Sequence, residues 1–166
     1  MLSDLPQWVF PVAIIGMFGL MVYRMWYGAR VLKAQGRAVR PKLPAEALFA
    51  EGGASGHSLR NVVTRLGGAS RVLLVWVTKR EFVVEAIFPF NVFMYENPYD
   101  LEHRVPVEAL TNVELEGRNA VCVSFNDSDQ QSHTLRLFVR QPDSLVSVLK
   151  SLGAPSNTSL ERTRGR

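Results

Sequence analysis

The residue types that most often carry chemistry are sparse in this chain and far apart in its sequence. The histidines are His57, His103 and His133, and Cys122 is the single cysteine. None of the spacings typical of zinc sites, such as HxxxH, HExxH or CxxC, joins any two of them. The sequence therefore predicts no metal site and no cofactor.

Signatures of catalysis are equally sparse. The sequence has no GxSxG nucleophile turn, no GxxxxGK[ST] phosphate loop and no GxGxxG dinucleotide turn. Cys122 lies in an alternating strand pattern with no basic neighbour to lower its pKa, which is typical of an unreactive thiol. Glu114 and Glu116 share one strand face, as exposed carboxylates usually do. A non-catalytic protein is predicted, and an enzyme acting on a lipid or envelope precursor is the least favoured alternative.

The elements that would position any site begin with an apolar segment. Leu5–Tyr23 has no charged residue. As a helix it rises about 28 Å, close to the thickness of a bilayer core. Pro11 predicts a kink inside it. A cleaved signal peptide would start with positive charge and end at small residues, and this segment does neither. A single transmembrane anchor is predicted.

Aromatic and basic residues flank the anchor unequally, which predicts its orientation. Six basic and no acidic residues lie within positions 24–42, whereas only Asp4 precedes the span. Basic flanks stay in the cytoplasm, so the N-terminus is predicted outside and the C-terminal domain inside the bacterial inner membrane. The predicted membrane-interface residues are Trp8, Tyr23, Arg24, Trp26, Tyr27, Arg30, Lys33, Arg37, Arg40 and Lys42.

Charge also argues against nucleic acid as a partner. The net charge of the whole chain is +4. Positions 43–159 nevertheless hold ten basic and thirteen acidic residues, so the predicted domain is slightly acidic. A nucleic-acid-binding domain carries its positive charge on a folded face. A chain with one cysteine also fits a reducing compartment better than a disulfide-stabilised secreted domain.

The sequence predicts four regions along the chain. Residues 1–34 form the anchor and a basic juxtamembrane helix, 35–56 a linker, 57–153 the folded domain and 154–166 a disordered tail. One or two helical turns are predicted at Ala45–Glu51, and the apolar spacing from Leu59 to Leu66 predicts a short amphipathic helix that covers the domain or lies on the membrane.

From Arg71 onward the apolar period changes to two, which is typical of strands. Val72–Thr78 and Phe82–Ile87 predict a hairpin around a Lys-Arg-Glu turn. LEHRVP, NVELE, AVCVSF and HTLRLFV predict four further strands. The apolar stripe of PDSLVSVLKSLG then predicts a C-terminal helix that covers an open, curved sheet. The predicted class is α+β.

This order resembles that of the bacterial pleckstrin-homology-like and GRAM-like domains. The resemblance rests on VWVTKREFVV, YDLEHRVPVEALTNVELEG, VCVSFNDSDQQSHTLRLFV and DSLVSVLKSL, and it covers Arg71–Gly153. It implies an antiparallel curved sheet or barrel of about six to seven strands capped by a C-terminal helix. Lipid-binding members of the family carry a basic cluster on the first hairpin, where this chain has only Lys79 and Arg80 beside Glu81.

The function predicted from these features is a membrane-tethered cytoplasmic binding or assembly module for a membrane protein or peptide. An anionic-lipid sensor with weak headgroup contacts is the alternative. The aromatic stretch Phe88–Asp100 connects two predicted strands. Its side chains are expected to be buried in the domain, to contact a partner or to insert into lipid. The candidate partner or lipid contacts are Arg60, Arg65, Lys79, Arg80, Phe90, Phe93 and Tyr95.

Overall fold

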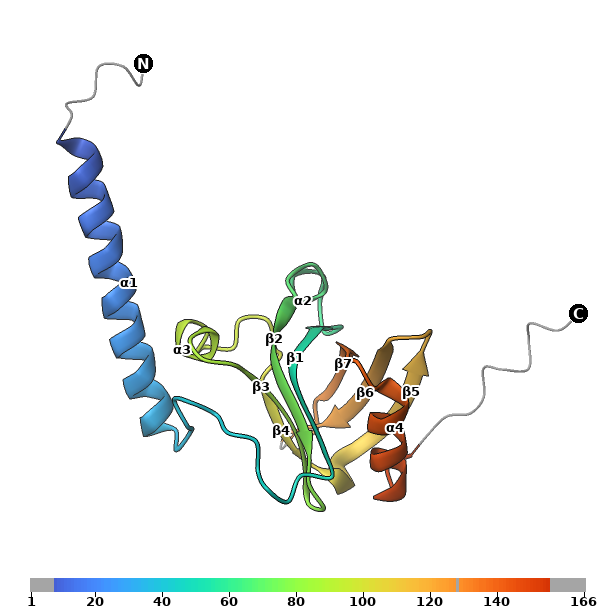
Figure 1. Ribbon diagram of the computed structural model, residues 1–166. Coiled ribbons are helices and arrows are strands. Elements are labelled where there is room, and N and C mark those ends of the chain that lie inside the picture. The colour runs from blue at the N-terminus through green and yellow to red at the C-terminus, as the bar shows by residue number, and fades with distance from the viewer. Residues whose placement is uncertain (1–7, 128, 156–166) are drawn as a thin grey trace, which may run out of the picture. The chain divides into compact units, whose positions relative to one another are not determined.

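The computed structural model describes residues 8–127 and 129–155, except for the side chains at positions 63 and 66. The chain forms two compact units (Figure 1). One comprises the residues up to Arg40 together with Phe88–Tyr95, and the other comprises the rest. Of the predicted tail at 154–166, Ala154 is buried in the core and the Pro155 carbonyl oxygen accepts a hydrogen bond from the Val113 amide, whereas 156–166 lie outside the described residues.

The larger unit is built on one antiparallel sheet of seven strands, in the order β4-β3-β2-β1-β7-β6-β5. Its strands are β1 Phe49–Ser58, β2 Ala69–Val77, β3 Glu81–Ala86, β4 His103–Pro106, β5 Leu110–Glu116, β6 Ala120–Asn126 and β7 Ser132–Phe138. The short helix α2, Val62–Leu66, joins β1 to β2, and the 3-10 turn Val107–Ala109 joins β4 to β5. The α+β class and the six predicted strands are confirmed.

Strand β1 corrects two predictions. Phe49–Ser58 is neither helical nor a linker, because it pairs with β2 on one side and β7 on the other. Its sequence, FAEGGASGHS, lacks an apolar alternation, because several positions are glycines that allow neighbouring strands to pack closely against its backbone. A Cβ at Gly56 would lie 2.9 Å from a Leu137 methyl carbon and 3.0 Å from the Arg136 carbonyl oxygen. The predicted helix after Leu59 is present but only five residues long.

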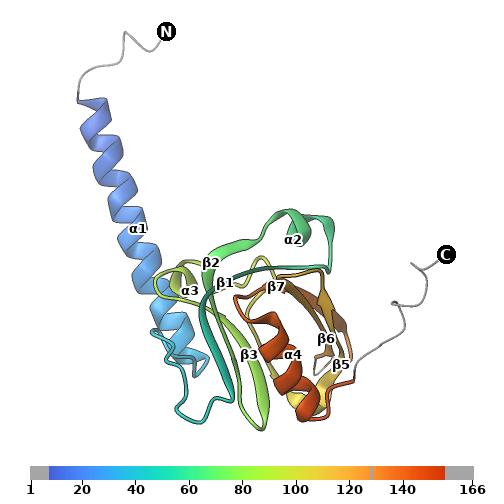
Figure 2. The ribbon, with the colours of Figure 1, turned by 45° about the vertical axis from the view of Figure 1, so that its right-hand side comes forward.

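Helix α4, Pro142–Ser151, covers the concave side of the curved sheet (Figure 2). Pro142 begins the helix and Asp143 lies in its first turn, where the amide dipoles favour a carboxylate. Leu145 and Leu149 are fully buried against β1, β5 and β6. The chain then leaves through Gly153, whose positive φ of 93° suits glycine.

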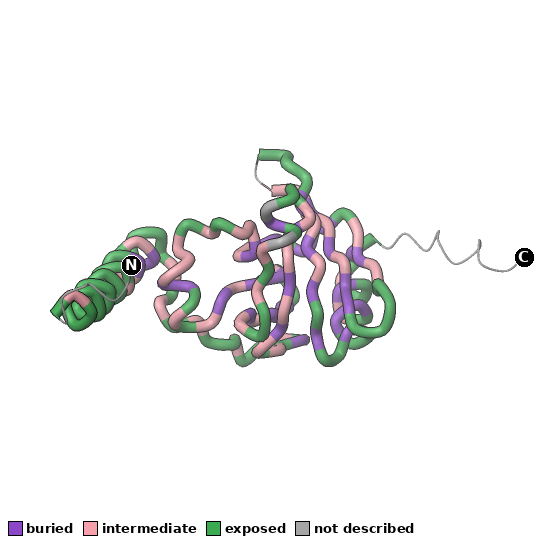
Figure 3. The backbone as a smooth tube through the Cα atoms, turned by 90° about the horizontal axis from the view of Figure 1, so that it is seen from above, coloured by how far each residue is buried: buried purple, intermediate pink, exposed green. Residues whose placement is uncertain are grey.

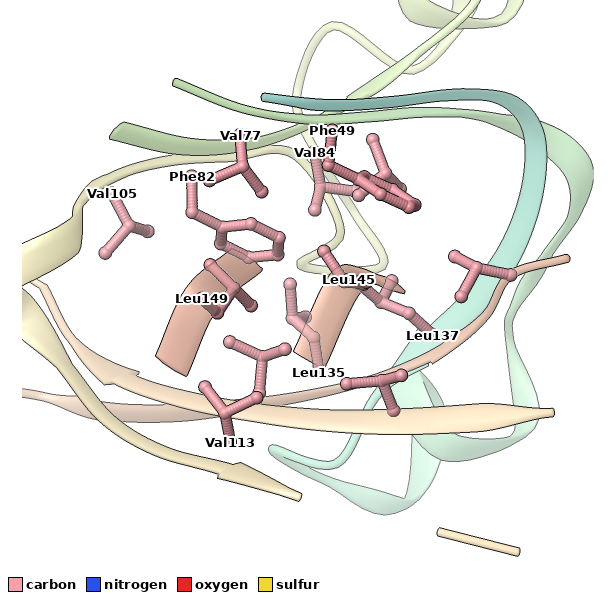
Figure 4. Packing of buried hydrophobic residues seen from close by; sticks show 14 of the residues in the cluster. Phe49, Val77, Phe82, Val84, Val105, Val113, Leu135, Leu137, Leu145 and Leu149 are labelled. Atoms are coloured by element: carbon pink, nitrogen blue, oxygen red, sulfur yellow. The ribbon is translucent and has the colours of Figure 1, made fainter. Parts of the chain in front are cut away.

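Burial alternates along the strands, as Figure 3 shows for the sheet. In β6 the buried residues Val121, Val123 and Phe125 alternate with half-buried ones. Phe82, Leu135 and the two α4 leucines fill the interior (Figure 4). The continuous core lies entirely within Phe49–Ala154 and includes no residue of the N-terminal helix.

The smaller unit contains the N-terminal helix α1, Val9–Ala34. It is long and apolar enough to cross a membrane, and none of its most apolar 18-residue window is buried. Figure 3 shows most of it as exposed. Pro11 does not interrupt the helix, because it lies in the first turn, where no backbone donor is needed. The helix ends at Ala34, and Gly36, two residues later, has a positive φ of 71°.

The connection between β3 and β4 returns to the end of α1. Its short helix α3, Phe90–Phe93, packs on α1. Gly28 is the contact point, because a Cβ there would overlap the carbonyl oxygen of Val92. Leu32 is fully buried, and the Tyr27 and Tyr95 rings meet edge to face with centroids 5.7 Å apart.

Candidate functional site

The fold assembles a group of polar side chains that the sequence does not bring together. We call Ser58, Arg60, Asp100, His103, Asp127 and His133 the polar centre. Ser58 ends β1, His103 begins β4 and His133 lies at the start of β7. His103 pairs with Val84 of β3, and His133 pairs with Phe125 of β6.

His133 lies between two carboxylates. Its Nδ1 is 3.1 Å from Oδ2 of Asp100, and its Nε2 is 3.0 Å from Oδ2 of Asp127. The His133 side chain is only 4% exposed. Each ring nitrogen therefore lies within hydrogen-bond distance of a carboxylate oxygen, which fixes the orientation of the ring. The Phe125 ring stacks on it at an angle of 8°.

His103 is the second imidazole of the polar centre. Its Nε2 lies 2.9 Å from the Asp100 carbonyl oxygen and 3.3 Å from Oδ1 of the same residue. Burial lowers the pKa of His103, since desolvation penalises its charged form more than Asp100 favours it. The His103 and His133 rings are 5.2 Å apart, and the charge on one opposes charge on the other.

Two turns fix the carboxylates. Asn97 Oδ1 accepts hydrogen bonds from the amides of Leu101 and Glu102, which shapes the turn that carries Asp100. Asn97 and Asp100 have positive φ angles of 51° and 52°, a conformation that Asn and Asp tolerate well. These bonds hold Asp100 beside both histidines.

Asp127 is fixed in the same way. Its Oδ1 accepts hydrogen bonds from the amides of Asp129 and Gln131. The Gln131 amide is the main cause of the lowered pKa of Asp127, which keeps this carboxyl ionised. Asp127 therefore faces His133 as a carboxylate.

The serine and the arginine of the centre both face Asp100. The Ser58 hydroxyl donates to Oδ2 of Asp100 at 2.9 Å, so among the described contacts no hydroxyl donates to either imidazole. Arg60 approaches Oδ1 of Asp100 at 3.8 Å, and its side chain is 47% exposed. Asp100, His103 and His133 offer one ligand atom each, all within 4.8 Å of one another.

No model of a known protein family and no curated protein matches this sequence. The site is therefore interpreted from its own geometry.

The predicted basic contacts do not converge. Arg60 and Arg65 lie in the connection before β2, whereas Lys79 and Arg80 lie in the turn after it. Nine residues of extended chain, about 30 Å, separate the two pairs. Arg65 Nε also donates to the Leu59 carbonyl oxygen. These four residues do not form one headgroup site.

The predicted aromatic contacts are divided between burial and exposure. Phe90 is 39% exposed, whereas Phe93 and Tyr95 are half-buried in the smaller unit. Asn91 is buried, and its Nδ2 donates to the Val39 carbonyl oxygen at 3.0 Å. The Phe88–Asp100 stretch is thus partly a packing surface for the end of α1 and partly open.

The predicted membrane-interface residues lie along α1 and the chain after it. Those whose side chains are exposed are Trp8, Tyr23, Arg24, Trp26, Tyr27, Arg30, Lys33, Arg40 and Lys42. Arg37 is half-buried. The guanidinium of Arg30 lies 4.0 Å from the Trp26 ring centroid, which keeps one cation at the aromatic end of the helix.

A separate open groove of about 820 Å³ lies over β1 and the end of β7. Arg71, Arg140 and Asn119 contribute to its lining. Glu51 is partly engaged there, since its carboxylate accepts the Arg140 amide at 2.8 Å and 3.0 Å. The groove has polar walls but no convergent set of titratable groups.

Cys122 lies away from the polar centre, and its thiol is 3.0 Å from Oε2 of Glu116. Burial and this carboxylate raise the pKa of Cys122 to about 12. Because only the thiolate reacts, raising the pKa by about three units lowers its population about a thousandfold below pH 9. Higher intrinsic nucleophilicity recovers part of this loss, leaving disulfide exchange roughly 30- to 60-fold slower.

Below pH 9, we therefore expect Cys122 to react with an aromatic disulfide roughly 30- to 60-fold more slowly in the native protein than in the protein unfolded in guanidinium. The rate should keep rising with pH beyond pH 10. Glu116→Gln should raise the rate by removing the neighbouring negative charge. Equal native and denatured rates would contradict the raised pKa.

Proposed function

We propose that the protein is a single-pass protein of the bacterial inner membrane whose cytoplasmic, pleckstrin-homology-like domain binds a membrane protein or peptide without catalysis. One observation carries the proposal. The apolar window of α1 is entirely unburied, while the core of the sheet unit is complete without it. An apolar helix that no core needs is explained by lipid.

The strand order supports the pleckstrin-homology-like part of the proposal. Two antiparallel meanders, β1–β4 and β5–β7, share one curved sheet through the pairing of β1 with β7. α4 closes its open side. This is the arrangement that the sequence resemblance implies. A fold of this kind supplies a rigid scaffold and does not by itself define a ligand.

Tethering supports a binding role. A partner in the same membrane meets the domain at high effective concentration, so weak contacts suffice. Phe88 and Phe90 are 37% and 39% exposed on the connection that packs on α1. Exposed aromatic side chains at one place are typical of contact surfaces. Among the described residues, Arg60, Arg65, Lys79 and Arg80 do not converge as the lipid-sensing alternative requires.

The first test concerns the membrane. We expect the protein to remain with bacterial membranes after alkaline carbonate washing and to leave them only with detergent. A reporter active only in the cytoplasm should work when fused to the C-terminus, and a reporter active only in the periplasm should not. Protein recovered in the soluble fraction, or the reverse pattern of reporters, would contradict the proposal.

The second test concerns the partner. A photo-crosslinking residue at position 90, in place of Phe90, should capture a membrane protein or peptide in intact cells. The same residue in place of Leu115, which is 45% exposed on β5, is the matched control. Capture at neither position, or only lipid adducts at position 90, would contradict a protein partner.

A further inference from the structure

The ligand atoms of Asp100, His103 and His133 lie within 4.8 Å of one another, close enough for small side-chain shifts to place them around one ion. Asp100 Oδ1 lies 3.3 Å from His103 Nε2, and Asp100 Oδ2 lies 3.1 Å from His133 Nδ1. Tetrahedral bonds of about 2.0–2.1 Å place ligand atoms roughly 3.3–3.4 Å apart. We propose that these three residues bind one divalent transition metal ion, with Zn²⁺ as the best fit. This site is independent of the membrane-tethered role.

The donor set selects the class of ion. Two imidazole nitrogens and one carboxylate oxygen suit Zn²⁺ and its neighbours in the first transition row, whereas Mg²⁺ and Ca²⁺ prefer oxygen ligands alone. Zn²⁺ has no geometric preference from its d electrons, so it accepts imperfect angles. Three protein ligands leave a position for water, as in open zinc sites.

The surroundings of His133 provide the second argument. An imidazole that binds a metal through one nitrogen usually donates its other N–H to a carboxylate, which fixes the ring. Here Nε2 donates to Asp127, and this leaves Nδ1 directed at Asp100. Backbone amides fix Asp127 in turn, and Phe125 stacks on the ring. The ring is therefore oriented before any ion arrives.

Metal binding requires three local changes. The ion takes the place of the contact between His133 Nδ1 and Asp100, and a proton held on that nitrogen leaves to solvent. At His103 the ion binds Nε2, which ends the contact between Nε2 and the Asp100 carbonyl oxygen and leaves the ring proton on Nδ1. Arg60, 3.8 Å from Asp100, moves toward solvent. These changes weaken binding relative to a site with no competing contacts.

The site is accessible to ions. The side chains of Asp100 and His103 are each 13% exposed, so two of the three ligands reach solvent while His133 stays buried. Cys122 does not compete, because its raised pKa keeps it a thiol and metal binding needs the thiolate. His57 lies elsewhere, on β1 beside Phe138.

The test uses the full chain in detergent, without a histidine tag and after treatment with a chelator. Zn²⁺ is titrated in competition with a chromophoric chelator, and Co²⁺ is titrated while visible absorption is recorded. We expect one ion per chain, micromolar or tighter binding of Zn²⁺, and the intense visible bands of four-coordinate Co²⁺.

Variants separate this site from incidental binding. Asp100→Asn and His103→Gln should each weaken Zn²⁺ binding by more than about tenfold, and Asp127→Asn by about 10- to 100-fold. Arg60→Gln should strengthen it by up to about fivefold, because a competing cation is removed. His57→Gln is the matched control and should leave the affinity unchanged.

The outcomes are distinguishable. Binding weaker than about 100 μM, or binding lost in His57→Gln and kept in His103→Gln, would overturn the proposal. Circular dichroism checks that each variant folds. If either ligand variant unfolds, the Zn²⁺ affinities of Arg60→Gln and Asp127→Asn test the proposal instead. An unchanged affinity in both of these variants would also overturn the proposed site.

Discussion

Leu149→Ala is expected to destabilise the sheet unit by about 2–5 kcal/mol. Leu149 is fully buried on α4, where Figure 4 shows it among side chains from both halves of the sheet. Truncation removes apolar contact and leaves a cavity, because a sheet held by hydrogen bonds on both sides of most strands relaxes little. The melting temperature should fall by roughly 10 °C or more.

Ser147→Ala is the matched control, since residue 147 lies on the exposed face of the same helix. It should change stability by less than about 0.5 kcal/mol. Urea unfolding of the full chain in detergent, followed by circular dichroism, measures both variants. Equal midpoints for the two variants would show that α4 does not hold the sheet closed.

Gly28→Ala is expected to release the β3–β4 connection from α1 without melting the sheet. A methyl group at position 28 overlaps the Val92 carbonyl oxygen, which is a backbone atom and cannot turn away. Overpacking of this kind costs about 1–3 kcal/mol, so local opening should increase about fivefold or more. The amides of Phe93 and Met94, which donate within this turn, report the opening.

Hydrogen exchange measured by mass spectrometry over residues 90–95 tests this prediction. Gly16→Ala provides the control, because nothing lies within 4 Å of a Cβ at that position. Both substitutions improve helix propensity equally, so the difference between them isolates the contact. Equal exchange in the two variants would contradict the packing of α3 on Gly28, and a lower melting temperature of the sheet would contradict its independence from this contact.

The later strands and α4 were predictable because each has its own periodic apolar face. Val121, Val123 and Phe125 alternate over β6, and α4 carries an apolar stripe with a proline start. β1 was not predictable in this way. It lies in the middle of the sheet, where close neighbours demand glycine, and its sequence resembles a linker.

The polar centre could be predicted only in part. The hairpin of β6 and β7 implies that Phe125 faces His133, and the turn between them places Asp127 nearby. Asp100 is different, because it belongs to a long connection whose path depends on tertiary packing. His103 follows Asp100 by three residues, but His133 lies thirty residues further on, so local spacing reveals only part of the cluster.

The outer strands of the sheet limit how the protein can pair with other chains. β4 is only four residues long and ends in Pro106, which cannot donate a backbone hydrogen bond. At the opposite margin, the Val113 amide of β5 donates to the carbonyl oxygen of Pro155. Both margins offer little template for a foreign strand, so neighbouring copies should resist amyloid-like stacking even at high local density.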